Sequence, residues 1–270
     1  MMKKISTIVT FILIAVAGWI LLPRNGLINK VYKLIDENKT EEAIQLIEIA
    51  DDVNAYSAPL FLRWAYNMVE TDIKLPLVYA CGKHNYEVVE ALLKKGADPN
   101  KYLEGGWSPI EATLSTRNDN RLEIAKLLIE YGANVNLYGS ESALFLEAMH
   151  LRSTDTEVEE AISMEVICLL LDNGASPISD DGYSILHLSA TGNKVEMTRI
   201  LIDKYGLNVN FTDPDGMTPL MLGAKDNAID TVKLLIEKGA DISIKDAAGK
   251  TAYDYAVEKG FTALAELLKP

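Results

Sequence analysis

The fold is decided by a stretch that recurs along the chain, and its clearest copy is TPLMLGAKDNAIDTVKLLIEKGADIS at residues 218–243. Thr218 followed by Pro219 predicts the start of a first helix, because the hydroxyl accepts from free backbone N–H groups and proline tolerates the first helical position. The leucine-rich run that follows predicts a second helix with one apolar face. Gly239 fits the position just beyond that helix, where a left-handed backbone favours glycine. The stretch therefore predicts two helices joined by a short turn.

Two phrases of this stretch recur along the chain with a period near 33 residues. The leucine-rich phrase occurs five times, as EVVEALLKKGADPN (87–100), LEIAKLLIEYGANVN (122–136), MEVICLLLDNGASPI (164–178), VEMTRILIDKYGLNVN (195–210) and DTVKLLIEKGADIS (230–243). The helix-start phrase occurs six times, as LPLVYAC (75–81), SPIEATL (108–114), SALFLEA (142–148), SILHLSA (184–190), TPLMLGA (218–224) and TAYDYAV (251–257). Because a two-helix unit cannot bury its apolar face alone, the units must stack.

These phrases resemble the ankyrin repeat, whose consensus begins T-P-L-H-x-A and ends L-L-x-x-G-A-D-x-N. The resemblance covers about residues 27–268 and implies an all-α repeat solenoid, an ankyrin-like stack of about seven helix-turn-helix units with β-hairpin connections. The expected units are an N-terminal cap repeat at 27–54, repeats at 75–100, 106–136, 140–177, 182–210 and 216–243, and a C-terminal cap repeat at 246–268. We expect one solenoid rather than two domains.

Two long insertions break the period. The insertion at 55–74 is expected to add a helix, or alternatively to pack its aromatic residues against the first two repeats. The insertion within 150–163 is expected to lengthen either the loop between two helices or the second helix. The turn at Asp246–Gly249 is expected to be one residue longer than the Asp-Gly turns at 181–182 and 215–216.

Residues 1–26 form a separate segment. Lys3 and Lys4 precede 18 uncharged residues, 5–22, which as a helix would extend about 27 Å, close to the ~30 Å hydrocarbon core of a membrane. We expect a signal-anchor, that is, a single transmembrane helix, or a signal peptide cleaved near Ala17; a buried core helix is a further alternative. The N-terminal lysines predict a cytoplasmic N-terminus, with the repeat body on the periplasmic or extracellular side.

The charge of the chain restricts its partners. Lys and Arg number 26 against 39 Asp and Glu, which gives a formal net charge of −13. A surface of this sign repels nucleic acid and anionic lipid, so we expect no nucleic-acid partner and no membrane contact beyond the N-terminal segment. The expected partner is another protein with a basic surface. Capped solenoids of this kind are expected to be monomers.

The sequence gives no indication of an enzyme, a cofactor or a metal site. The three histidines fall in three separate repeats and form no ligand cluster. The resemblance implies that His187 makes a structural hydrogen bond between turns and that His84 stands where the turn between helices usually has glycine. Cys81 and Cys168 lie two repeats apart, too far for a disulfide. We therefore expect no catalytic, cofactor-binding or metal-binding residues, and an enzyme built from the insertions is only a remote alternative.

The resemblance places the binding surface in a concave groove, formed by the hairpin tips and the exposed faces of the first helices. The residue just before the capping Thr or Ser is expected to project into this groove. The groove candidates are Trp107, Tyr138, Glu141, Asp181, Tyr183, Asp215 and Met217. Aromatic residues and methionine beside carboxylates match the composition of protein-binding hot spots. The alternative is that Trp107 and Tyr183 only cover their own hairpins.

These observations predict a non-enzymatic protein–protein interaction module, located at or beyond a membrane, that binds its partner through the groove. A narrower alternative is an inhibitor or immunity protein that neutralises a basic toxin or enzyme in the cell envelope. The acidic groove candidates and the net charge of −13 favour this alternative, because they would steer a basic protein towards the chain.

Overall fold

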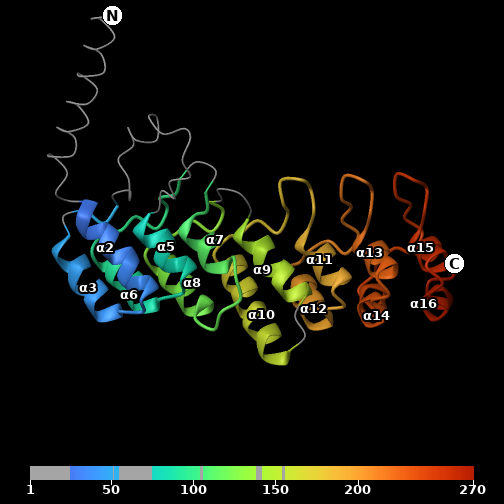
Figure 1. The fold of residues 1–270 in the computed structure, drawn as a ribbon. Helices are drawn as coiled ribbons and strands as arrows, with labels where there is room; N and C mark the ends of the chain where they lie inside the picture. The colour runs from blue at the N-terminus through green and yellow to red at the C-terminus, as the bar shows by residue number, and fades with distance from the viewer. Residues whose placement is uncertain (1–24, 51, 55–74, 104–105, 138–141, 154–155) are drawn as a thin grey trace, which may run out of the picture. The chain divides into compact units, whose positions relative to one another are not determined.

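The computed structural model describes residues 25–50, 52–54, 75–103, 106–137, 142–153 and 156–270. These residues contain fourteen helices and no sheet (Figure 1). The helices follow one another in seven pairs, so the predicted all-α stack of helix-turn-helix units is confirmed. Within the described ranges, the expected hairpin connections contain no named strand and a single isolated antiparallel bridge, between Ile178 and Ser184.

Contacts between residues divide the chain into two compact units, Met1–Asn134 and Val135–Pro270. The helices of the first unit are α2 (Asn25–Asp36), α3 (Thr40–Ile49), α5 (Pro76–Gly82), α6 (Tyr86–Lys94), α7 (Pro109–Leu114) and α8 (Arg121–Glu130). The first helices of its pairs pack side by side, with α5 against both α2 and α7, and the second helices do the same, with α6 against both α3 and α8. Small buried residues such as Ala80 and Ala112 allow the first helices to approach closely.

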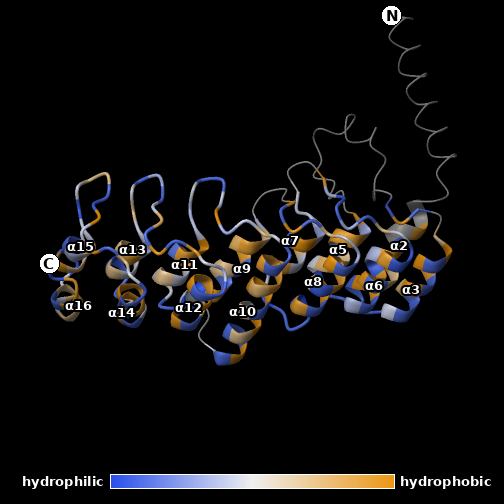
Figure 2. Cartoon of the chain, turned by 180° about the vertical axis from the view of Figure 1, so that it is seen from behind, coloured by the Kyte–Doolittle hydropathy of each residue, from blue (hydrophilic) through white to orange (hydrophobic). Residues whose placement is uncertain are grey.

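The second unit contains the other four pairs. Its helices are α9 (Ala143–Arg152), α10 (Glu157–Asp172), α11 (Ile185–Thr191), α12 (Val195–Asp203), α13 (Pro219–Lys225), α14 (Ile229–Glu237), α15 (Ala252–Glu258) and α16 (Thr262–Leu267). The first helices α9, α11, α13 and α15 pack in that order. Each helix carries both hydrophobic and hydrophilic residues (Figure 2), as expected of amphipathic helices that bury one face against their neighbours.

The predicted helix starts are confirmed by their hydrogen bonds. The hydroxyls of Ser108, Ser184 and Thr218 each accept from a backbone N–H in the first turn of the following helix. Ser108 also forms a reciprocal capping box, because its own N–H donates to the carboxylate of Glu111 at 2.6 Å. His84 has a φ of 53°, which confirms that it occupies the left-handed turn between two helices.

In each of the two units, a set of asparagines ties repeats to the repeat that follows them. The amide group of each donates to the carbonyl of the glycine that ends the next second helix, and its oxygen accepts from the N–H two residues beyond that glycine. The pairs are Asn54 with Gly96 and Asp98, Asn100 with Gly132 and Asn134, Asn136 with Gly174 and Ser176, and Asn210 with Gly239 and Asp241. Ile178 occupies the equivalent position of its repeat and has no amide to make these bonds.

The second insertion extends a helix. The helix α10 begins at Glu157 and is 16 residues long, whereas the other second helices of this unit have nine or six residues. Of the two expectations for 150–163, the longer second helix is confirmed. The first helix α9 is also longer, with ten residues against seven in α11, α13 and α15. The insertion at 55–74 lies outside the described residues.

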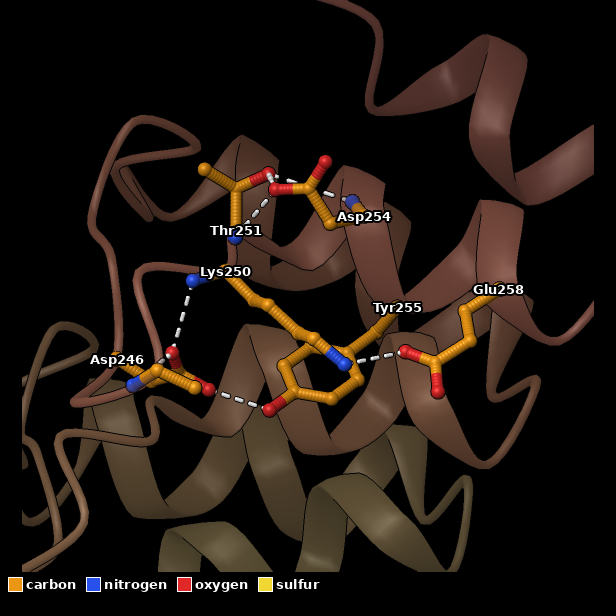
Figure 3. A network of polar contacts seen from close by, with 7 residues as sticks. Asp246, Lys250, Thr251, Asp254, Tyr255 and Glu258 are labelled. Atoms are coloured by element: carbon orange, nitrogen blue, oxygen red, sulfur yellow. Dashed lines mark hydrogen bonds and ion pairs between the residues drawn. The ribbon is translucent and has the colours of Figure 1, made fainter.

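Three turns of equal length lead into the helices α11, α13 and α15. In each, the N–H of the first residue donates to the carbonyl of the fifth: Ser179 to Tyr183, Asp213 to Met217 and Asp246 to Lys250. Figure 3 shows the last of them, in which the carboxylate of Asp246 also accepts from the N–H of Lys250. The expectation of one extra residue at Asp246–Gly249 is wrong, because the counterpart of Asp246 is Asp213, which opens the preceding turn.

The turns of the second unit also contact one another. The N–H of Ala247 donates to the carbonyl of Asp215 at 2.9 Å. A Cβ on Gly216 would lie 3.1 Å from that same nitrogen, and the φ of Gly216 is 78°. Glycine is therefore required at this position both by the backbone conformation and by the close approach of the next turn.

The membrane expectation concerns residues 1–26, most of which lie outside the described part of the chain. Among the residues that the structure does describe, no helix is both long enough and apolar enough to cross a membrane.

Candidate functional site

The structure brings some of the groove candidates together and separates others. Tyr138 and Glu141 lie outside the described residues, and Trp107 belongs to the first unit. Asp181, Tyr183 and Asp215 lie close enough for the two carboxylates to act electrostatically on the phenol. The described candidates therefore belong to two separate units.

In the first unit, Trp107 borders a pocket of about 320 Å³. Its other described lining residues are Leu75, Val78, Tyr79, Gly82 and Lys83 in and around α5, Leu103 and Gly106 in the loop, and Ala112 of α7. The indole is 44% exposed. Trp107 thus both lines a pocket and keeps part of its indole accessible.

The rim of this pocket is polar on one side. The hydroxyl of Tyr79 donates to Asp36, and the ammonium of Lys83 lies 3.1 Å from the same carboxylate. Burial, followed by the hydrogen bond to Asp36, raises the pKa of Tyr79. The ring of Tyr32 packs edge-on against Tyr79 with 5.1 Å between centroids, which fixes the position of the phenol.

In the second unit, Tyr183 borders a larger pocket of about 610 Å³, which we call the Tyr183 pocket. It is formed by the first helices α9 and α11, the loop that connects α10 to α11, and two residues that precede α9. Its apolar lining residues are Phe145, Met149, Ile178 and Leu188, and its polar ones are Asn136, Ser142, Ser176, Ser179, Asp180 and Asp181. Met149 is 54% exposed and Ile178 is 40% exposed, so the pocket offers apolar surface to solvent.

Tyr183 is held in place from two sides. Its N–H donates to the hydroxyl of Ser179 at 3.0 Å, and its ring lies edge-on to the imidazole of His187 with 5.7 Å between centroids. Burial raises the pKa of Tyr183, and the carboxylates of Asp213, Asp215 and Asp181 raise it further. The phenol therefore sits in a region of negative potential.

The expectation that Met217 projects into the groove is wrong. Its side chain is only 7% exposed and belongs to the core cluster with Leu220, Ala252 and Leu268. The unbranched thioether adapts to the gap between neighbouring repeats and is buried there. Met217 thus stabilises the stack instead of lining a binding surface.

His187 makes the structural contacts that the resemblance implies. Its Nδ1 accepts from the N–H of Ser184 at 3.2 Å, and its Nε2 lies 3.0 Å from the carbonyl of Met217 in the next turn. The first contact requires an unprotonated Nδ1, so the second is a donation from Nε2–H, which defines a neutral imidazole. Burial lowers the pKa of His187, in agreement with this neutral state.

The described residues offer little reactive chemistry. Among them there is no group of three or more His, Cys, Asp or Glu side chains that could hold a metal ion. Both cysteines are free thiols. Cys81 is completely buried, and burial raises its pKa to about 12, so its thiol is not a reactive nucleophile at neutral pH.

Reasoning from the sequence missed the apolar lining of the Tyr183 pocket, namely Phe145, Met149, Ile178 and Leu188. One signal could have identified Ile178. The phrases GADPN and GANVN end in the bridging asparagine, whereas GASPI ends in Ile178. Ile178 is an exposed apolar residue at a position where other repeats have a polar one. Such a residue indicates a binding surface, because the stability of the stack does not require it.

Comparison with known proteins agrees with the geometry of the repeats. Residues 29–138 and 158–246 match the family described as ankyrin repeats (3 copies). The putative ankyrin repeat protein FPV230 of fowlpox virus (strain NVSL) is 31% identical over 193 residues, which cover 68% of this chain and 93% of that protein. The putative ankyrin repeat protein L371 of Acanthamoeba polyphaga mimivirus is 30% identical over 201 residues, which cover 66% of this chain and 26% of that protein.

A longer protein with a different printed activity is also similar. The E3 ubiquitin-protein ligase KEG of Arabidopsis thaliana is 24% identical over 224 residues, but these cover 67% of this chain and only 14% of the ligase. The similarity therefore extends over a small part of that protein. The family match, in contrast, extends over most of the chain described above. The chain belongs to the ankyrin repeat family.

Proposed function

We propose that this protein is a non-enzymatic interaction module that binds a partner protein through the surface where its first helices meet the connecting turns. Ankyrin repeats are protein–protein interaction modules, which supports the general role. The observation that carries the specific proposal is the Tyr183 pocket, about 610 Å³ in volume, in which Met149 and Ile178 expose apolar surface beside polar side chains. An apolar centre with a polar rim is typical of the energetically important part of a protein interface.

The test is capture of a partner by the full chain, using the wild type and two variants as baits. The first variant carries Met149→Ala and Ile178→Ala in the Tyr183 pocket. The second is a matched control, Leu267→Ala, which removes an apolar side chain of similar exposure, 39%, from the second helix α16. We expect the wild type and the control to capture the same protein and the double variant to lose it. Equal capture by all three would contradict the proposed site.

A location at or beyond a membrane is proposed from residues 1–26 alone. The uncharged run 5–22 supports either a retained anchor or a cleaved signal peptide, with the repeats on the periplasmic or extracellular side. Alkaline carbonate extraction of membranes distinguishes the two forms, because a retained anchor keeps the chain in the pellet. An N-terminus that begins near Gly18 in the mature protein would demonstrate cleavage.

A second candidate function is that of an inhibitor or immunity protein for a basic toxin or enzyme in the same compartment. It is supported by the net charge of −13 and by the carboxylates around Tyr183. Long-range attraction would raise the association rate with a basic partner at low salt. If the captured protein were acidic, or if it associated at the same rate at low and high ionic strength, this candidate would be excluded.

A further inference from the structure

The Tyr183 pocket has a chemical character that restricts its occupant. Its apolar side is formed by Phe145 and Met149 of α9 and by Leu188 of α11, all within one unit. Met149 and Ile178 keep 54% and 40% of their surface exposed. Covering such surface with an apolar side chain of a partner is favourable, because it removes apolar area from water. One part of the occupant is therefore apolar.

The lining of the pocket also carries negative charge. Asp181 lines it, and Asp215 acts on the same phenol of Tyr183. Among the described residues, neither Asp181 nor Asp215 takes part in an ion pair, whereas the basic side chains Lys194, Lys204, Lys238 and Lys250 of this unit are each paired with another carboxylate. The negative potential at the pocket is thus not neutralised by these lysines, and it favours a cation from outside.

The apolar residues and Asp181 line the same pocket, so a single short segment can contact both. Arginine fits the charged part of the pocket. Its guanidinium can donate hydrogen bonds to the carboxylate of Asp181, and it can also stack on the ring of Tyr183. Its aliphatic stem tolerates the apolar surroundings. The volume of about 610 Å³ leaves space for a neighbouring apolar side chain over Met149 and Ile178.

Building on the proposed function, we infer that the Tyr183 pocket recognises a segment of the partner protein in which an arginine is adjacent to a large apolar residue. The arginine pairs with Asp181 beside Tyr183, and the apolar residue covers Met149 and Ile178. This assignment defines the chemistry of the partner: an exposed basic and apolar segment, not an acidic one. A lysine in place of the arginine keeps the charge but loses the planar contact with the ring.

The inference is tested with the full chain, kept in a mild neutral detergent, and fluorescent twelve-residue peptides measured by anisotropy. The peptides share an uncharged carrier and differ only in a central pair: Arg-Leu, Lys-Leu, Glu-Leu or Arg-Gly. We expect Arg-Leu to bind at least about tenfold more tightly than Glu-Leu and several-fold more tightly than Arg-Gly, with Lys-Leu between them. Binding of Arg-Leu no tighter than Glu-Leu, or no binding of Arg-Leu up to millimolar concentration, would overturn the inference.

Two charge-neutralising variants locate the effect. Asp181→Asn keeps the shape of the side chain and is expected to weaken binding of the Arg-Leu peptide by about threefold or more. The matched control is Glu237→Gln, which removes one negative charge from an exposed position at the end of α14 and should leave the affinity nearly unchanged. Equal effects of the two variants would overturn the assignment of the arginine to Asp181.

The outcomes also separate this inference from the proposed function. If the Met149→Ala and Ile178→Ala variant loses its captured partner while all four peptides bind alike, the inference fails and the proposed function stands. If that variant retains its partner, the proposed function itself fails. Preference for Arg-Leu together with loss of the partner supports both.

Discussion

The side-chain amide of Asn136 donates to the carbonyl of Gly174 at 2.8 Å, and its oxygen accepts from the N–H of Ser176 at 2.8 Å. One side chain thus satisfies two backbone groups of the next repeat.

The first prediction is that Asn136→Ala lowers the free energy of unfolding by roughly 1–2 kcal/mol, because two hydrogen bonds are lost at a partly solvated site. Urea denaturation measures this change. Asn173→Ala, which loses one bond to its own helix at 2.8 Å, serves as the control and should cost less; an equal or greater loss in the control would contradict the bridging role.

A second prediction concerns the long helix α10. The ammonium of Lys194 is mostly buried and lies 2.8 Å from the carboxylate of Glu160 in the extended part of that helix. Glu160→Gln is expected to destabilise the protein by about 1–3 kcal/mol, because the buried ammonium loses a charged partner. Replacing both residues, as Lys194→Met with Glu160→Gln, should recover part of this loss.

The exposed pair of Lys204 and Asp172, 2.9 Å apart, provides the comparison for this second prediction. Its removal by Asp172→Asn should leave the denaturation midpoint almost unchanged, since exposed ion pairs contribute little. If Glu160→Gln behaved in the same way as Asp172→Asn, the extension of α10 would not depend on the Lys194 contact.

A third prediction follows from the buried histidines. Burial lowers the pKa of both His84 and His187 below the ordinary value near 6.5; for His187 the carboxylate of Asp213 opposes this shift to a smaller extent. Below pH 6.5 the unfolded chain therefore binds more protons than the folded chain, and stability falls as the pH decreases from 6.5 towards the lowered pKa values. At pH 5.5 the loss is at most about 1.4 kcal/mol for each histidine.

The measurement is the free energy of unfolding at pH 7.5, 6.5 and 5.5. The variant His84→Asn with His187→Gln should show a smaller decrease over this range than the wild type; asparagine is chosen at position 84 because it tolerates the left-handed φ of 53°. A wild-type stability that is constant from pH 7.5 to 5.5, or an equal slope in the variant, would contradict the neutral buried state of these histidines.

A fourth prediction concerns the last turn of the chain. The carboxylate of Asp246 accepts from the N–H group of Ala248. It also accepts from the N–H group of Lys250 and from the hydroxyl of Tyr255 (Figure 3). The pKa of Asp246 is lowered, mainly by the hydrogen bond that it accepts from Tyr255. Asp246→Ala should therefore lower stability by about 1–3 kcal/mol and increase amide exchange at Lys250.

The variant Asp246→Asn separates the contribution of the hydrogen bonds in the turn from the contribution of the negative charge. Its amide oxygen can still accept from the two backbone N–H groups, so the variant should retain more stability than Asp246→Ala. Amide exchange followed by mass spectrometry reports on residues 246–250 directly. Identical exchange in the alanine variant and the wild type would show that the carboxylate does not maintain this turn.

The sequence predicted the repeats well because their determinants are local. The cap at Ser108, the left-handed turn at His84 and the helix-ending glycines each depend on a few neighbouring residues, and they recur in register. The length of α10 could not be decided from the sequence, because a polar stretch such as 150–156 fits a loop or a helix end equally well. The bridging asparagines Asn100, Asn136 and Asn210 end three of the five leucine-rich phrases, but their bonds reach into the next repeat and become visible only in the stack.

The candidate site was less predictable, because it depends on which side chains remain exposed after the repeats have packed. Tyr183 and Met217 occupy equivalent positions before their capping residues, yet Met217 is buried in the core whereas Tyr183 stays half-buried among carboxylates. The flexible thioether of Met217 fills a gap between repeats, while the phenol of Tyr183 lies beside the carboxylates of Asp213, Asp215 and Asp181. Periodicity identifies such positions but does not decide between these two outcomes.

The most direct test of the account is site-specific photo-crosslinking within the full chain. A photoreactive phenylalanine analogue at position 178, in the Tyr183 pocket, is compared with the same analogue at position 237, on the exposed end of the second helix α14. We expect the captured partner to crosslink from position 178 and not from position 237. Crosslinking from position 237 with none from position 178 would contradict it, because the binding surface would then lie on the second helices.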